Sequence, residues 1–135
     1  MTASQPPADS RLRVLIVEDI DINRDLLIQL LEESHDLAVA SDGEEGLRLA
    51  KEWQPDVVLL DLSLPKLDGW SVARALRDLP TRSRMLVVAL TAHAMAGDEE
   101  RALAAGCDAY LAKPIDDDRL FDLLAEAARS RENRA

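Results

Sequence analysis

The sequence is poor in the residues and segments that mark secreted or membrane-bound proteins. It has a single cysteine, Cys107, so no disulfide can form within the chain, and this usage fits a reducing compartment. The N-terminal segment is polar and has no apolar core of the kind found in signal peptides. No apolar run approaches the roughly 20 residues that a membrane span needs. We therefore expect a cytoplasmic protein that does not act at a membrane.

Basic residues are fewer than acidic residues. The chain has 16 Lys and Arg residues against 26 Asp and Glu residues, a formal net charge of −10. This charge argues against non-specific binding to nucleic acid or to anionic membranes, but it leaves a basic protein partner or a cation open. At 135 residues the chain fits one domain. We predict a flexible lead-in over residues 1–11, a folded domain over 12–129 and a charged tail over 130–135.

Within that domain, strand patterns alternate with helix patterns. Short apolar runs predict strands over residues 12–17, 37–41, 56–60, 84–92 and 109–112. Helical patterns follow each of them, over 23–33, from 41, over 69–78 and 97–105, and from about 116. Such alternation is typical of an α/β protein, a doubly wound parallel sheet with helices on both faces. Among the few topologies that right-handed crossovers allow, we predict the common flavodoxin-like (βα)5 strand order 2-1-3-4-5.

Two local signals mark the ends of helices. Ser41 is followed three residues later by Glu44, which is the pattern of a capping box at the start of the second helix. Gly106 follows the fourth helical pattern and is suited to end it. Trp53, Trp70 and Cys107 carry no pattern of a ligand site, and we interpret them as packing residues.

An acidic residue at the end of a very apolar run is the most informative local feature. Asp61 follows Val57–Leu60, a run typical of a strand that is buried on both faces. A buried carboxylate needs compensating partners. Because the carboxyl ends of parallel strands meet at one edge of the sheet, the polar residues near or just after the ends of the other strands should share that edge. These residues are Glu18, Asp19, Thr91 and Lys113.

The chemistry of this set is specific. Three carboxylates, Glu18, Asp19 and Asp61, repel one another unless they are protonated or bridged by a cation. A cluster that offers only oxygen ligands suits a hard ion such as Mg²⁺. Lys113 and Thr91 add an ammonium group and a hydroxyl, and the whole set suits a phosphoryl group.

Four motifs carry a resemblance to a known family. The segments "LIVEDIDIN", "VVLLDLSLPKLDGW", "VVALTAHAMAGDEE" and "GCDAYLAKPI" resemble, in order and spacing, those of the bacterial response-regulator receiver domain over about residues 12–128. The last part is most similar to stand-alone DivK-like receivers and to the receiver modules of hybrid kinases. The resemblance implies that Asp61 is the phosphoacceptor, a carboxylate nucleophile that attacks a phosphohistidine or a small phosphodonor.

The resemblance also implies a metal site and a second set of partners around Asp61. Asp19 and Asp61 would bind Mg²⁺ directly, together with the backbone carbonyl of Ser63, and Glu18 would act mainly through water. Lys113 would pair with Asp61 and later with the phosphoryl oxygens, and its peptide bond to Pro114 is cis in the family.

The remaining roles concern the conformational switch and the lifetime of the phosphoryl group. By resemblance, Thr91 would hydrogen-bond the phosphoryl group, and Tyr110 would be the aromatic switch that turns inward when Thr91 moves. Ser63 and His93 stand close enough in sequence to Asp61 and Thr91 to be candidates for tuning dephosphorylation.

The function implied is a signalling switch within a two-component system or phosphorelay. A sensor histidine kinase or a histidine phosphotransfer protein would donate the phosphoryl group, and Mg²⁺ would be required. Only the last helix and a charged tail follow Lys113, so we expect output by partner binding or onward phosphotransfer rather than by DNA binding. The partner surface would be the face of the fourth helix, fifth strand and fifth helix. Catalysis would be limited to the chain's own phosphorylation and dephosphorylation.

Three other functions remain in competition. A phosphohydrolase with an aspartyl nucleophile usually has a second Asp two residues later, where this chain has Ser63. An interaction module that has lost phosphorylation is opposed by the complete set of Asp19, Asp61, Thr91 and Lys113. A flavodoxin-type electron carrier is opposed by the absence of a phosphate-cradling Ser/Thr/Gly run after the first strand.

Overall fold

The computed structural model describes residues 11–62, 69–91 and 97–134, and for 131–134 only the backbone. The lead-in predicted for residues 1–11 therefore lies almost wholly outside the described residues, as do Ser63 and His93. The domain boundaries at residues 12 and 129 stay a prediction.

The centre of the fold is one parallel sheet. Its five strands lie in the order β2-β1-β3-β4-β5, which confirms the predicted topology. Strands β1 and β3 are neighbours although a complete strand and two helices separate them in sequence. The strands are β1 (Arg13–Val17), β2 (Asp36–Ala40), β3 (Val57–Asp61), β4 (Leu86–Thr91) and β5 (Ala109–Ala112).

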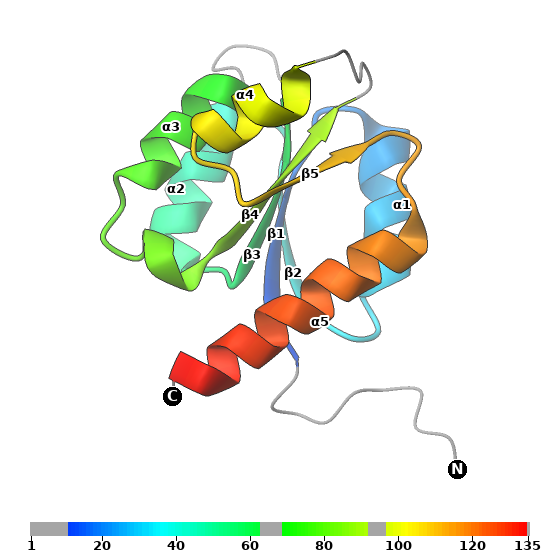
Figure 1. Cartoon of the computed structure of the whole chain (residues 1–135). Helices are drawn as coiled ribbons and strands as arrows, with labels where there is room; N and C mark the ends of the chain where they lie inside the picture. The colour runs from blue at the N-terminus through cyan, green and yellow to red at the C-terminus, as the bar shows by residue number, and fades with distance from the viewer. Residues whose placement is uncertain (1–10, 63–68, 92–96, 135) are drawn as a thin grey trace.

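Helices cover both faces of the sheet. α1 and α5 lie on one face, and α2, α3 and α4 lie on the other (Figure 1). Within the described part of the chain, no helix combines the length and the apolarity needed to cross a membrane. The helices are α1 (Asp21–Leu31), α2 (Gly43–Trp53), α3 (Gly69–Arg77), α4 (Asp98–Ala104) and α5 (Asp117–Arg134), which includes most of the segment predicted as a tail.

The apolar runs in the sequence follow from burial on both faces. In β3, Val58 and Leu60 pack into the core under α2 and α3, while Val57 and Leu59 pack into the core under α1 and α5. Both faces of this strand are buried along its whole length. Burying an aliphatic side chain contributes about 1.5–3 kcal/mol, so β3 is firmly held. Asp61 is the last residue of this strand and is fixed in position by it.

The predicted start of the fourth strand needs correction. The fourth strand begins at Leu86 and not at Arg84, because Arg82–Arg84 form a short 3-10 turn, η2. The guanidinium of Arg82 donates hydrogen bonds to the carbonyls of Met85 and Gly106, which ties this turn to the end of α4. Gly106 has a φ of +112°, as expected for a glycine that ends a helix.

The capping box predicted for α2 is wrong by one residue. The N-cap is Asp42, whose Oδ1 accepts a hydrogen bond from the backbone N–H of Glu45 at 2.9 Å. Glu45 in turn accepts from the backbone N–H of Ser41 at 3.0 Å. Asp42 can cap because its own backbone is extended, with φ −148° and ψ 171°.

Removing this cap gives a stability test of the fold. We expect Asp42→Ala to lower the free energy of unfolding by about 1 kcal/mol, because an N–H in the first turn of α2 loses its acceptor. Urea unfolding followed by circular dichroism measures the change. Ser41→Ala is the control, because its main-chain N–H remains; an equal loss in both variants would contradict the assignment of Asp42 as the cap.

Candidate phosphoryl and metal site

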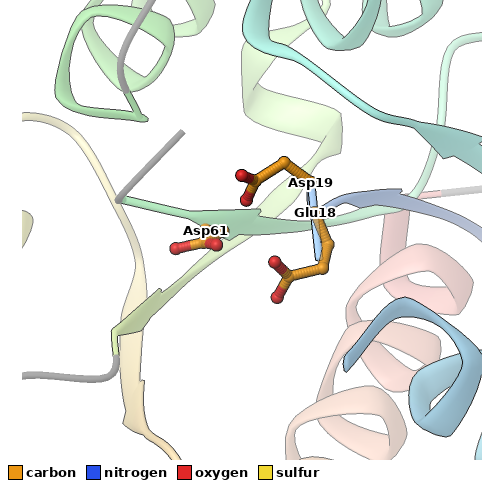
Figure 2. Close-up of side chains that lie close together, drawn as sticks. All are labelled: Glu18, Asp19 and Asp61. Atoms are coloured by element: carbon orange, nitrogen blue, oxygen red, sulfur yellow. The ribbon is translucent and has the colours of Figure 1, made fainter. Parts of the chain in front are cut away.

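Three carboxylates meet at the carboxyl edge of the sheet. Glu18 directly follows β1, and Asp61 ends β3, the neighbouring strand. One oxygen from each of Glu18, Asp19 and Asp61 lies within 4.8 Å of the others, and the three side chains point toward a common centre (Figure 2). Glu18 is fully buried, and Asp61 is only 1% exposed. The convergence that strand order predicted is thus present in the structure.

Lys113 supplies the opposite charge. Its Nζ lies 2.6 Å from Oε1 of Glu18 and 3.4 Å from Oδ2 of Asp61. The ammonium therefore bridges the two carboxylates and is closer to Glu18, whereas the resemblance implied Asp61 as its partner. The backbone N–H of Lys113 donates to the carbonyl of Thr91 at 2.7 Å, which fixes its position beside β4. The Lys113–Pro114 peptide bond is cis, as the resemblance implied.

One ammonium does not neutralise this site. Burial, together with the adjacent Asp61 carboxylate, raises the pKa of Glu18 to about 7, although Lys113 lowers it. Near neutral pH the metal-free site can thus hold a proton on Glu18. A divalent cation that binds here competes with that proton.

Asp19 provides the clearest indication of a metal. Its Oδ1 is buried and has no hydrogen-bond partner among the described residues. An unpaired buried carboxylate oxygen is costly, and here it belongs to a cluster of three carboxylates. The donor set is hard and consists of oxygens only, which fits Mg²⁺. Asp19 and Asp61 could hold the ion, with Glu18 behind them; the carbonyl of Ser63 lies outside the described residues.

Thr91 and Tyr110 lie on the next strands of the same edge. Thr91 ends β4 and is buried, and Tyr110 lies in β5 with a buried hydroxyl. Burial and the carboxylates of Asp98 and Glu99 raise the pKa of Tyr110, while the Thr91 side chain lowers it. The structure thus brings the two predicted switch residues together and leaves their role as a proposal.

Five parallel strands in this order, with an acidic cluster and a lysine at their carboxyl ends, define a receiver-like α/β protein. The sequence profile of the response regulator receiver domain matches residues 14–125. The chain belongs to this family, which acts in two-component signalling.

Individual relatives agree with this assignment. The polar-differentiation response regulator DivK of Brucella anthropi is 40% identical over 112 residues, 82% of this chain and 91% of DivK. The receiver domain of the sensor histidine kinase PA1611 from Pseudomonas aeruginosa, solved with magnesium in its active-site cleft, superposes with a TM-score of 0.80 at 34% identity. That match covers 87% of this chain and 98% of the PA1611 domain.

A third similarity is to a chain of a yeast complex. This complex is the co-crystal structure of the Saccharomyces cerevisiae histidine phosphotransfer protein Ypd1 with the receiver domain of its downstream response regulator Ssk1. The TM-score is 0.80 at 31% identity, with 87% of this chain and 89% of the other covered.

The sequence analysis missed an apolar surface beside the site. Leu26 lies within the helical pattern predicted over residues 23–33, but the structure buries Leu27 and Leu31 and leaves Leu26 55% exposed and Ile22 69% exposed. A groove of about 240 Å³ separates α1 from the segment after β5, and Leu26, Glu18 and Lys113 all line it. α1 has more apolar residues than one buried stripe needs, and this surplus was the signal in the sequence for an exposed apolar surface.

Competition between a proton and a metal ion at Glu18 predicts that the stability of the folded chain depends on pH. The pKa of Glu18 is raised in the folded state from 4.5 to about 7, so its contribution to stability is present below pH 4.5 and is lost as the pH rises through 7. Mg²⁺ should offset this loss by binding the ionised site.

Thermal unfolding in EDTA and in 10 mM Mg²⁺, a concentration on the order of that used for weak Mg²⁺ sites, measures the effect. We expect a larger Mg²⁺-induced rise in Tm at pH 8 than at pH 6. Glu18→Gln should remove the difference between the Mg²⁺-induced rises in Tm at the two pH values, whereas the exposed control Glu44→Gln should keep it. A rise in Tm that is equal at both pH values in the parent chain would refute the competition.

Proposed function

We propose that this chain is a phosphorylation-dependent switch in which Asp61 accepts a phosphoryl group from a histidine kinase or a histidine phosphotransfer protein. The observation that carries the proposal is the buried Asp61 carboxylate, held by a rigid strand, next to Asp19 and Lys113. The phosphotransfer protein in the yeast complex and the magnesium in the PA1611 domain support the donor class and the metal by analogy.

The chemistry is a displacement at phosphorus. An oxygen of Asp61 forms a bond to phosphorus while the bond from phosphorus to the donor's imidazole nitrogen breaks, and that nitrogen keeps the electron pair. Mg²⁺, held by Asp19 and Asp61, would supply positive charge to the phosphoryl oxygens. Lys113 would supply a second positive charge, and its ammonium contact with Asp61 at 3.4 Å supports this role. Thr91 would donate its hydroxyl proton to a phosphoryl oxygen.

Input and output would use different surfaces. The apolar groove beside α1 opens next to Lys113, where a protein that carries a phosphohistidine would need to dock. Output by partner binding would use the face of α4, β5 and α5, where Leu103 and Phe121 are exposed.

Intact mass after incubation with acetyl phosphate tests the proposal directly. We expect one phosphoryl adduct that requires Mg²⁺ and is absent in Asp61→Asn, because the amide is not a nucleophile and binds Mg²⁺ poorly. Steady phosphate release without an adduct would favour the phosphohydrolase. A complete absence of both, also with phosphorylated donor proteins, would favour an interaction module without phosphorylation.

Docking at the α1 groove has a separate test. We expect Leu26→Ser to slow phosphotransfer from a phosphorylated histidine phosphotransfer protein about tenfold, because burying one leucine contributes about 1.5–3 kcal/mol to an interface. Phosphorylation by acetyl phosphate, which needs no docking surface, should be unchanged. Leu103→Ser is the matched control, an exposed leucine on α4; equal slowing in both variants would argue against the groove.

A further inference from the structure

The first residue of α3 lies directly against the backbone of the proposed phosphoacceptor. A Cβ at Gly69 would overlap the carbonyl oxygen of Asp61 and the Cα of Leu62. Only glycine therefore lets the start of α3 pack this closely on the end of β3. Because there is no free space between them, a shift of the main chain at Asp61 has to move the start of α3 as well.

The next residue connects α3 to α4. The guanidinium carbon of Arg101, on α4, lies 4.2 Å from the centroid of the Trp70 ring, a distance typical of a cation–π contact. Trp70 is half-buried and packs against the core under α2 and α3. Its ring is thus held by α3, while the exposed Arg101 side chain lies over it from α4.

α4 buries little of its own surface, and its end is tied to η2 by the hydrogen bond from Arg82 to Gly106. It is seven residues long, and its one buried residue is Ala102. Its N-cap, Gly97, makes no side-chain capping hydrogen bond. Short helices are only marginally stable without tertiary contacts, so the stacking of Arg101 on Trp70 is one of the contacts that fix α4 relative to α3.

We propose that Gly69, Trp70 and Arg101 form a mechanical connection from Asp61 to α4, which acts beside the pair of Thr91 and Tyr110. A change at Asp61 moves the start of α3, the Trp70 ring moves with it, and Arg101 transmits the movement to α4. This inference rests on the proposed function, because it describes how phosphoryl binding at Asp61 reaches the proposed output face.

Hydrogen exchange of α4 tests the connection. The measurement compares peptides that cover residues 98–105 in the full chain, with and without Mg²⁺ and beryllofluoride, a stable stand-in for the phosphoryl group. In the parent chain we expect beryllofluoride to change the exchange rate of α4. Arg101→Gln and Trp70→Leu should lose at least half of that change, on a logarithmic scale, whereas Trp70→Phe keeps a ring and should retain it.

The chain offers a matched control for the loss of a cation–π contact. Arg13 lies over the ring of Trp53, 5.6 Å from its centroid, at the end of the sheet opposite to Asp61. Arg13→Gln removes a similar contact and should leave the α4 response as it is in the parent chain. A response that Arg101→Gln fully retains, or an α4 that does not respond in the parent chain, would overturn the connection.

Failure of the connection and failure of the proposed function are distinguishable by mass. Arg101 does not contribute to the site, so Arg101→Gln should form the acetyl phosphate adduct as the parent chain does. Adduct formation together with an unchanged α4 response in Arg101→Gln refutes only the connection. The absence of an adduct in the parent chain, with acetyl phosphate and with phosphorylated donor proteins, refutes the proposed function and this inference with it.

Discussion

The burial of negative charge at the carboxyl edge of the sheet is the constraint on which the rest of the structure depends. Glu18 and Asp61 are buried and share one ammonium, that of Lys113, and Asp19 adds a third carboxylate. Burial, together with the neighbouring Asp61 carboxylate, raises the pKa of Glu18, and a buried oxygen of Asp19 has no hydrogen-bond partner among the described residues. A divalent cation that fits would lower the free energy of this site, and under the proposed function that cation and Lys113 would both face the incoming phosphoryl group.

The sheet makes this arrangement possible because its strands resist displacement. β1 and β3 are buried on both faces for most of their length, and they hold Glu18 and Asp61 in fixed positions. α4, in contrast, buries one residue. The rigid elements carry the groups that need exact placement for chemistry, and the weakly held element lies where a conformational response is proposed. We therefore expect α4 to move more readily than the sheet.

The exposed apolar residues divide into two groups on different helices. Ile22 and Leu26 lie on α1 beside the groove that reaches Lys113, and Leu103 and Phe121 lie on α4 and α5. The net charge of −10 over the whole chain favours partners with basic residues near an apolar contact. A donor and an output partner could bind these two surfaces without competing for the same side chains.

The sequence by itself determined the elements and the residues of the proposed site. The apolar runs predicted β5 over residues 109–112 without error, and the polar residues after each strand predicted the cluster of Glu18, Asp19 and Asp61. These features are local, since burial on both faces leaves a continuous apolar run and a strand end leaves a polar residue. Only the tertiary structure decided that Asp42 caps α2, that Leu26 is exposed, that Lys113 is closer to Glu18 than to Asp61, and that Arg101 stacks on Trp70. Each of these depends on the distance or angle between side chains from different elements or turns, and that is set by packing rather than by periodicity along the chain.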